Sequence, residues 1–163
     1  MLPVEYTLQL PRYKQEWRNI CAILPVYLAD GTNGTAITYT DGSVEEVPNR
    51  LYWVLDDLLG YLKSSKSILT KQSRTVLGDK ARCVPLALSP DFCLMLVKGR
   101  EGIGKYDKNA GYIVQRHVDK LVSAGNGTRV IFNSGAEVQV KNKPRTVWEN
   151  LQKTEALKQK LCA

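Results

Sequence analysis

The chain has 163 residues, of which 44% are hydrophobic and 24% are charged, a balance typical of one folded domain and not of a disordered polymer. Its longest uninterrupted apolar run, Phe92 to Val97, is far shorter than the roughly 18 residues that a membrane-spanning helix needs. The N-terminus has no basic leader followed by an apolar segment, so we expect a cytoplasmic protein and no membrane partner.

The formal charge of +7 is distributed unevenly along the chain. Residues 1–61 contain four basic and eight acidic side chains, whereas residues 62–163 contain 19 basic and eight acidic ones. The two parts therefore carry net charges of −4 and +11. Such asymmetry favours a polyanionic partner, most often nucleic acid, although a basic surface can also serve only to keep a protein in solution.

The four cysteines are irregularly spaced, with no Cys-x-x-Cys pair, and His117 is the only histidine. This pattern matches neither a disulfide framework nor the paired ligands of a zinc site, so we expect no metal. Cys21 and Cys93 lie among apolar residues, where buried reduced thiols are expected.

A repeat organises the chain. Residues 33–42 recur as residues 126–135, so that Asn33-Gly34 matches Asn126-Gly127 with a shift of 93. Asn-Gly favours a type I′ turn, and we expect such a turn in both copies, with Gly34 and Gly127 at positive φ. Further turns are predicted at Gly42 and Gly135, which makes each copy a three-stranded antiparallel meander.

The first strand of each meander is expected at Ile20–Leu28 and at about Gly111–Val122. A helix follows each meander. Asn49 is predicted to cap the first, whose apolar positions repeat at helical spacing: Leu51, Val54, Leu55, Leu58, Leu59 and Leu62. Thr146–Glu149 has the pattern of a capping box that begins the second helix, with the stripe Val147, Leu151, Thr154, Leu157 and Leu161.

Residues 63–110 separate the two copies. They begin with a polar segment rich in Ser and Lys, Lys63–Ser73, continue with a hairpin predicted from Val84–Leu88 and Phe92–Lys98, and end with the loop Arg100–Asn109. We therefore predict a β-rich α+β fold. Residues 1–163 form a single domain with two similar meander-plus-helix halves, about 18–62 and 111–161, joined by a basic segment and a hairpin.

No residue pattern supports catalysis. Gly99–Lys105 matches the phosphate-loop pattern, but Tyr106 stands where a Ser or Thr hydroxyl must reach magnesium, and no helix pattern follows. Asp56 and Asp57 lie on the polar face of the first predicted helix, where solvated charge is expected. We assign no catalytic residue and no cofactor, and we expect a protein that is not an enzyme.

Three basic clusters remain as candidates for DNA contact, because cationic side chains interleaved with hydroxyl groups suit a phosphate backbone. The first lies within residues 63–82, the second begins after the hairpin, and the third precedes the second helix. The candidate residues, with the basic pair in the second half, are Lys63, Lys66, Lys71, Arg74, Lys80, Arg82, Lys98, Arg100, Arg116, His117, Lys141, Lys143 and Arg145.

The order of segments resembles the ComK family of competence transcription factors from Gram-positive bacteria. The resemblance rests on Cys21-Ala-Ile-Leu-Pro, Arg82-Cys-Val-Pro-Leu, the Ser-Pro-Asp hairpin, Gly111-Tyr-Ile-Val-Gln-Arg-His-Val and Ile131-Phe-Asn-Ser-Gly. It implies a transcriptional activator that contacts AT-rich DNA through the minor groove. The second half also resembles the LytTR DNA-binding domain, in which Arg116 and His117 match basic contact residues.

The leading hypothesis is therefore a nucleoid-associated regulator of transcription that binds double-stranded DNA. The alternative is a basic interaction module that binds a protein or RNA without enzymatic activity. RNA polymerase, a protease adaptor and a second copy of the chain are further candidate partners that the sequence leaves open.

Overall fold

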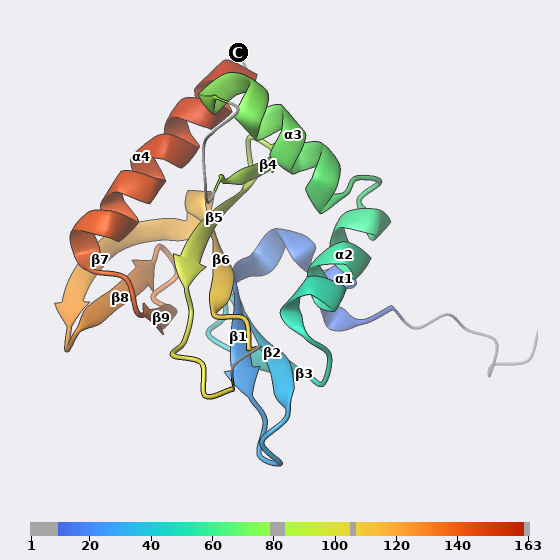
Figure 1. The fold of residues 1–163 in the computed structure, drawn as a ribbon, viewed down its shortest axis with the longest axis vertical. Helices are drawn as coiled ribbons and strands as arrows, with labels where there is room; N and C mark the ends of the chain where they lie inside the picture. The colour runs from blue at the N-terminus through green and yellow to red at the C-terminus, as the bar shows by residue number, and fades with distance from the viewer. Residues whose placement is uncertain (1–9, 79–83, 105–106, 162–163) are drawn as a thin grey trace, which may run out of the picture.

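The computed structural model describes residues 10–78, 84–104 and 107–161 (Figure 1). Within these ranges the chain forms two antiparallel sheets, of six and three strands, with helices around them, which confirms the predicted β-rich α+β class. The elements are α1 (Arg12–Gln15), η2 (Trp17–Asn19), β1 (Ile20–Tyr27), β2 (Asn33–Tyr39), β3 (Val44–Val47), α2 (Leu51–Tyr61), α3 (Lys66–Leu77), β4 (Leu86–Ser89), β5 (Phe92–Lys98), β6 (Ala110–Val114), η3 (Gln115–His117), β7 (Val118–Ala124), β8 (Gly127–Phe132), β9 (Glu137–Val140) and α4 (Pro144–Leu161). None of the helices in these ranges is long and apolar enough to cross a membrane.

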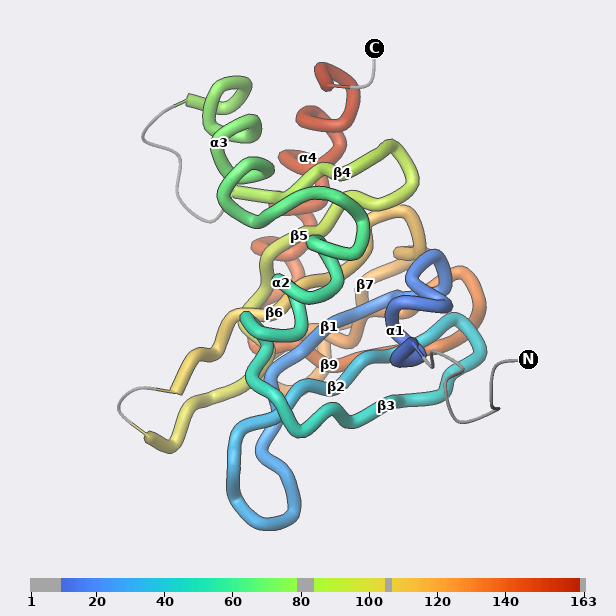
Figure 2. Tube along the Cα trace, turned by 90° about the vertical axis from the view of Figure 1, so that its right-hand side faces the viewer, coloured from blue at the N-terminus to red at the C-terminus, as the bar shows by residue number. Residues whose placement is uncertain are grey.

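The six-stranded sheet, in the order β3-β2-β1-β6-β5-β4, forms the middle layer of the molecule. Helices α1, α2 and α3 cover one of its faces (Figures 1 and 2). The core on this face joins Ile23, Tyr39 and Tyr112 of the sheet to Leu55 and Leu58 of α2, all of them buried. Each such side chain contributes about 1.5–3 kcal/mol when it leaves water.

The opposite face of the same sheet packs against the three-stranded sheet, β7-β8-β9, and the first turns of α4. Ala22, Met95 and Ile113 point to this side, where they contact a cluster that includes Phe132 and Val147. Because neighbouring residues of a strand face opposite sides, the apolar runs of β1, β5 and β6 supply both cores at once. This explains why these strands are apolar at nearly every position.

The two halves form the same hydrogen bonds at positions 93 residues apart. Thr35, which is buried, donates its hydroxyl to the Asn49 carbonyl (2.8 Å), and buried Thr128 donates to the Asn142 carbonyl (2.7 Å). Each bond fixes the place where the chain leaves the meander and enters its helix. The described residues thus contain two meander-plus-helix units, one consisting of η2, β1–β3 and α2 and the other of η3, β7–β9 and α4.

The prediction of positive φ at Gly34 and Gly127 is wrong. Both glycines lie in strands, and the turns before them use Gly31 (φ +85°) and Gly125 (φ +57°). The reason for glycine is instead a close approach of two backbones. A Cβ atom on Gly34 would lie 2.9 Å from the Val47 carbonyl oxygen, and one on Gly127 would lie 2.1 Å from that of Val140. The later turns agree with the prediction, because Gly42 and Gly135 both have positive φ.

The single strand predicted at Gly111–Val122 is also wrong. The chain is interrupted by the 3-10 turn η3, and the segment before it, β6, belongs to the six-stranded sheet. There β6 pairs with β1 and β5, so Gly111 belongs to the six-stranded sheet and not to the second meander. The strand that opens the second meander is β7 alone. The change of sheet at η3 is a tertiary effect, because it depends on which distant strands β6 and β7 pair with.

Both helix starts differ from their predicted caps. Asn49 does not cap α2, because Arg50 occupies the N-cap position and no side chain accepts a hydrogen bond there. Helix α4 begins at Pro144, two residues before Thr146, so the predicted capping box lies inside the first turn. Proline suits the first helical position because its missing N–H has no partner there in any case.

The exposed edge of β5 is closed by the segment that enters α4. At the end of β5 that β4 does not reach, the Lys98 N–H donates to Asn142 Oδ1 (2.6 Å), and the Lys98 carbonyl accepts from the Lys141 N–H (2.8 Å). The Asn150 side-chain amide donates to the Leu96 carbonyl (3.2 Å). Backbone groups that β4 leaves without a strand partner are thereby satisfied by the second half of the chain.

The buried cysteines agree with expectation. Cys21 and Cys93 both lie in the core, and burial raises the pKa of the Cys21 thiol to about 11. A thiol with so high a pKa is protonated at neutral pH and therefore unreactive. Cys83 and Cys162 lie outside the described residues.

The close backbone approach at the two strand glycines can be tested by adding one methyl group. We expect Gly127→Ala to lower the free energy of unfolding by about 1–3 kcal/mol, with a smaller loss for Gly34→Ala, because the Val140 or Val47 carbonyl must move away. Gly60→Ala in α2 is the control: nothing lies within 4 Å of its added Cβ, and we expect about 0.5–1 kcal/mol of stabilisation. Urea unfolding measures all three, and wild-type stability of Gly127→Ala would contradict the close approach.

Candidate nucleic-acid interface

Helix α3 carries the first basic cluster, and the sequence analysis missed it as a helix. Ser65 caps its start by accepting a hydrogen bond from the Ile68 N–H (3.1 Å), and Gly78 ends it at φ +116°. The helix is anchored through buried Leu69 and Ser73, whose hydroxyl donates to the Pro85 carbonyl (2.5 Å). The sequence features that indicate this helix are Ser65 as the N-cap, Gly78 at the end, and the short buried stripe of Leu69 and Ser73.

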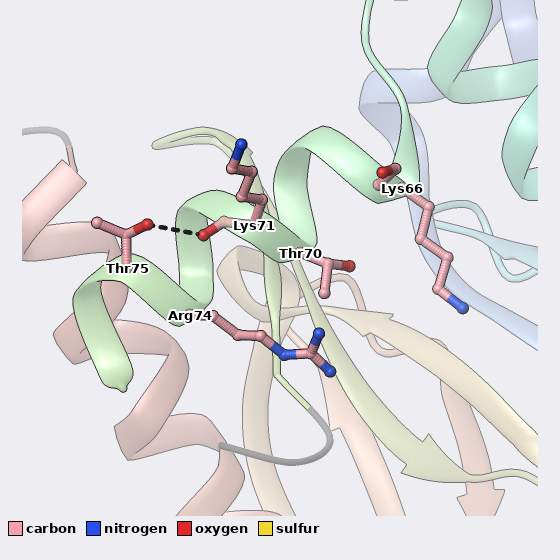
Figure 3. Close-up of a pocket in the computed structure, with 6 residues that line it drawn as sticks. Lys66, Thr70, Lys71, Arg74 and Thr75 are labelled. Atoms are coloured by element: carbon pink, nitrogen blue, oxygen red, sulfur yellow. Dashed lines mark hydrogen bonds between the residues drawn. The ribbon is translucent and has the colours of Figure 1, made fainter. Parts of the chain in front are cut away.

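The anchoring of α3 leaves its polar side chains facing an open hollow of about 540 Å³. Lys66, Thr70 and Arg74 lie on one side of the helix, whereas Lys71 projects from the other (Figure 3). No carboxylate forms an ion pair with these three cations within the described residues. All residues that line the hollow are basic or carry a hydroxyl: Lys66, Ser67, Thr70, Lys71, Arg74 and Thr75.

Two further hollows continue this surface toward α4. One, of about 210 Å³, shares Lys66, Thr70 and Arg74 and reaches the sheet at Leu96 and Ala110. The next, of about 350 Å³, shares Leu96 and Ala110 and ends at α4; its other lining residues are Val97, Lys98, Asn109, Asn142, Thr146 and Asn150. We call these three adjoining hollows the basic groove. Within the described part of the chain, no acidic residue lines it.

An aromatic ring holds the first cation of the groove in position. The Lys66 ammonium lies over the ring of Tyr52, 4.1 Å from its centroid. Such a contact contributes about 0.5–1 kcal/mol at an exposed site. It restricts the lysine to the junction of α2 and α3 and leaves its charge available to a ligand.

Lys63 lies just after the end of α2 and is not among the residues that line the groove. It is the one residue other than glycine with positive φ (+62°) among those described, and its N–H donates to the Gly60 carbonyl (3.0 Å). Its side chain is exposed. Lys80 and Arg82, also predicted to contact DNA, lie outside the described residues.

The second basic cluster is divided between surface and interior. Lys98 is exposed and pairs with Glu101 (3.0 Å). Arg100 is only 9% exposed; its Nε and Nη2 donate to the Lys108 carbonyl (3.1 and 2.9 Å), and its guanidinium lies 4.1 Å from the centroid of the Tyr27 ring. Arg100 therefore holds the two ends of its loop together, which its sequence position did not reveal.

The basic pair in the second half is divided in the same way. Arg116 is exposed and pairs with Asp91 (3.6 Å) across the turn between β4 and β5. His117 is 9% exposed, and its Nε2 lies 3.2 Å from the Arg18 carbonyl oxygen. Burial lowers the pKa of His117, so the neutral ring is favoured. Arg116 lies outside the basic groove, and His117 is part of the core.

The third cluster surrounds the start of α4. Lys141, Lys143 and Arg145 are all exposed, and Arg145 pairs with Glu149 one turn further along the helix (3.1 Å). Exposed pairs of this kind contribute under about 1 kcal/mol, so Arg145 can exchange its partner for a phosphate at little cost.

One cation was missed altogether. Arg50 is exposed at the N-cap of α2 and lines a small hollow together with Arg100 and Lys108. It is the only basic residue between Arg18 and Lys63 in the sequence, so a search for clusters passed over it. The only available signal was its position directly before an apolar helix.

Asp56 and Asp57, both expected to be solvated, differ in their surroundings. Asp56 is exposed, as expected, but Asp57 accepts a hydrogen bond from the Tyr13 hydroxyl and pairs with Lys14 Nζ (2.9 Å). These contacts attach α1 to α2, and they lower the pKa of Asp57 against the opposing effect of burial. Its role is structural.

Comparison of the chain with protein-family models, with curated proteins and with solved structures finds no match. The resemblance to the ComK and LytTR families therefore stays a prediction from the sequence.

The burial of His117 has a measurable consequence in acid. Its pKa in the folded chain lies below the value of about 6.5 for an unfolded chain, so the unfolded state binds the proton more readily. We expect the stabilisation to be complete above that pH and to be lost as the pH falls toward the folded-state pKa. Urea unfolding of wild type and His117→Gln at pH values on both sides of 6.5 measures this. Parallel losses of stability in the two proteins would contradict it.

Proposed function

We propose that this chain binds double-stranded DNA through the basic groove and acts as a regulator of transcription of the competence-factor type. The observation that carries the proposal is helix α3, whose cations Lys66, Lys71 and Arg74 line one hollow together with hydroxyl groups and with no acidic residue among those described. Nucleoid association follows from such binding. The proposal involves no cofactor and no chemical reaction.

The electrostatics of α3 support a phosphate partner. Three cations within one hollow repel one another, and the described residues supply no carboxylate to offset this. A phosphate backbone removes the repulsion and releases condensed counterions. Ser67 and Thr70 add hydroxyl donors of the type that phosphate oxygens accept.

The spacing of the cations also suits a nucleic-acid strand. From Lys66 to Arg74 the helix axis advances about 12 Å at 1.5 Å per residue. Successive phosphates of one DNA strand advance by about 3.4 Å along the duplex. Lys66 and Arg74, which lie on the same side of α3 (Figure 3), can therefore contact different phosphates of one strand that runs beside the helix.

The simplest test is a gel-shift titration with an AT-rich duplex, a GC-rich duplex and an RNA duplex of equal length. We expect the AT-rich duplex to bind most tightly, as the resemblance to the ComK family implies. Binding of neither DNA duplex below micromolar concentration would overturn the proposal. Preference for RNA would favour the alternative of an RNA-binding module.

The contribution of α3 can be isolated by its salt dependence. We expect the combined substitution of Lys66, Lys71 and Arg74 by Gln to weaken binding to every duplex and to reduce the slope of log K against log salt by about two to three. The matched control replaces Arg18, Lys120 and Arg129, three exposed cations outside the groove, by Gln. Equal slopes for the two triple variants would mean that α3 does not contact the phosphates.

Arg116 tests whether base sequence is recognised away from the groove. An arginine inserted into a narrow AT-rich minor groove gains from its enhanced negative potential. We therefore expect Arg116→Ala to cost about 1–3 kcal/mol on the AT-rich duplex and less on the GC-rich one. An equal loss on both duplexes would make Arg116 a backbone contact, and no loss would leave it the surface partner of Asp91.

A further inference from the structure

The start of α2 lacks the partners that a helix start requires. Its N-cap residue, Arg50, provides no side-chain acceptor, and the first turn contains no acidic residue. The N–H groups of Leu51, Tyr52 and Trp53 precede the first intrahelical hydrogen bond, which Val54 donates to the Arg50 carbonyl (3.2 Å). These groups, together with the helix dipole, favour an anion at this point.

A second observation at the same place is the buried guanidinium of Arg100. Its Nε and Nη2 have acceptors, including Asn33 Oδ1, but Nη1 is buried and has no hydrogen-bond partner. Asp107 does not pair with this guanidinium, because no Arg100 nitrogen lies within 4 Å of the Asp107 carboxylate. That carboxylate instead accepts hydrogen bonds from the Tyr27 hydroxyl, the Asn33 side-chain amide and the Gly104 N–H. An unpaired donor on a buried cation is costly and calls for an acceptor.

Residues of the helix start and Arg100 border the same hollow, whose lining includes Arg50, Leu51, Tyr52, Arg100 and Lys108. The hollow measures about 30 Å³. That is enough for about one water-sized atom. A single oxygen of a larger anion can enter, while Arg50 and Lys108, both exposed, reach the remaining oxygens from the rim.

We propose that the start of α2 is a binding site for a phosphate group, formed by the free N–H groups of α2, Arg100 in the interior and Arg50 and Lys108 at the rim. The inference extends the proposed function, on which the choice of a DNA phosphate rests. The hollow shares Tyr52 and Ala110 with the basic groove, so a duplex held along α3 passes close to it. A phosphodiester suits the small volume because only one of its unesterified oxygens needs to enter.

The second half of the chain supplies a matched control. By the shift of 93, Lys143 at the start of α4 corresponds to Arg50 at the start of α2. There, however, the side chain of the preceding Asn142 accepts a hydrogen bond from the Lys98 N–H at the edge of β5. Among the described residues that line the adjoining hollow, none is a buried cation such as Arg100, so the start of α4 is not expected to bind phosphate in the same way.

The test uses inorganic phosphate as the probe, titrated at constant ionic strength while the backbone amide NMR signals of the whole chain are recorded. We expect saturable shifts at Leu51, Tyr52 and Trp53. Arg50→Gln and Lys108→Gln change exposed side chains and keep the hydrogen bonds from Arg100 to the Lys108 carbonyl. Each should weaken phosphate binding about tenfold, which corresponds to the loss of one charge-assisted hydrogen bond. Lys143→Gln should leave it unchanged.

A parallel arm uses the AT-rich duplex and identifies the source of the phosphate. A fall of about one in the salt slope for Arg50→Gln assigns the site to the DNA backbone. Phosphate binding that Arg50→Gln weakens, with an unchanged duplex slope, assigns the site to a small phosphate-bearing ligand. If the amides of α2 respond to neither probe, or if Lys143→Gln weakens phosphate binding as much as Arg50→Gln, the site is disproved. Failure of the duplex alone to bind would disprove the proposed function and leave the phosphate arm decisive.

Discussion

The pairing of β1 with β6 is the contact on which the rest of the structure depends. Only Ala22 with Ile113 and Ile23 with Tyr112 are in register, yet this short ladder joins the first meander to the hairpin β4–β5 and its continuation. Ile23 and Tyr112 enter the core beneath α2, whereas Ala22 and Ile113 enter the core shared with the second sheet. The strands lie so close that a Cβ atom at Gly111 would be 2.9 Å from the Ile23 carbonyl oxygen. Both cores, and through them both helix-bearing halves, are aligned by these two residue pairs.

The duplicated halves keep their internal bonds and differ in what their helix starts do. The threonine bond to the carbonyl before each helix is the same in both, as are the later glycine turns. Arg50 and its counterpart Lys143 are both exposed, but the Asn142 side chain accepts a hydrogen bond from the β5 edge, whereas the hollow at the start of α2 is lined by the buried Arg100. The same backbone frame thus serves edge closure at one helix start and borders a buried cation at the other.

Sequence reasoning succeeded where local chemistry decides and failed where distant contacts decide. The repeat, the hairpin and the fold class follow from turn residues and periodicity, which act over a few residues. The change of sheet between β6 and β7, and the burial of Arg100 and His117, depend on segments that meet only in the folded chain. For the same reason Gly34 and Gly127 were interpreted as turn formers, although glycine is needed there because the backbone of a neighbouring strand leaves no room for a Cβ atom. Helix α3 was missed because its exposed positions outnumber its buried ones, and the cations among them concealed a stripe that includes Leu69 and Ser73.

The free edge of β5 is covered only while α4 and the segment before it stay in place. If α4 and the segment before it detached, the groups of Leu96 and Lys98 that now bond to Asn150, Asn142 and Lys141 would be exposed beside an apolar strand. Such an edge pairs readily with another chain, which is the first step of aggregation. A fragment that ends before β7 would therefore face this hazard even with its own core intact. The second half of the chain thus shields the edge of the insert's hairpin from pairing with other chains.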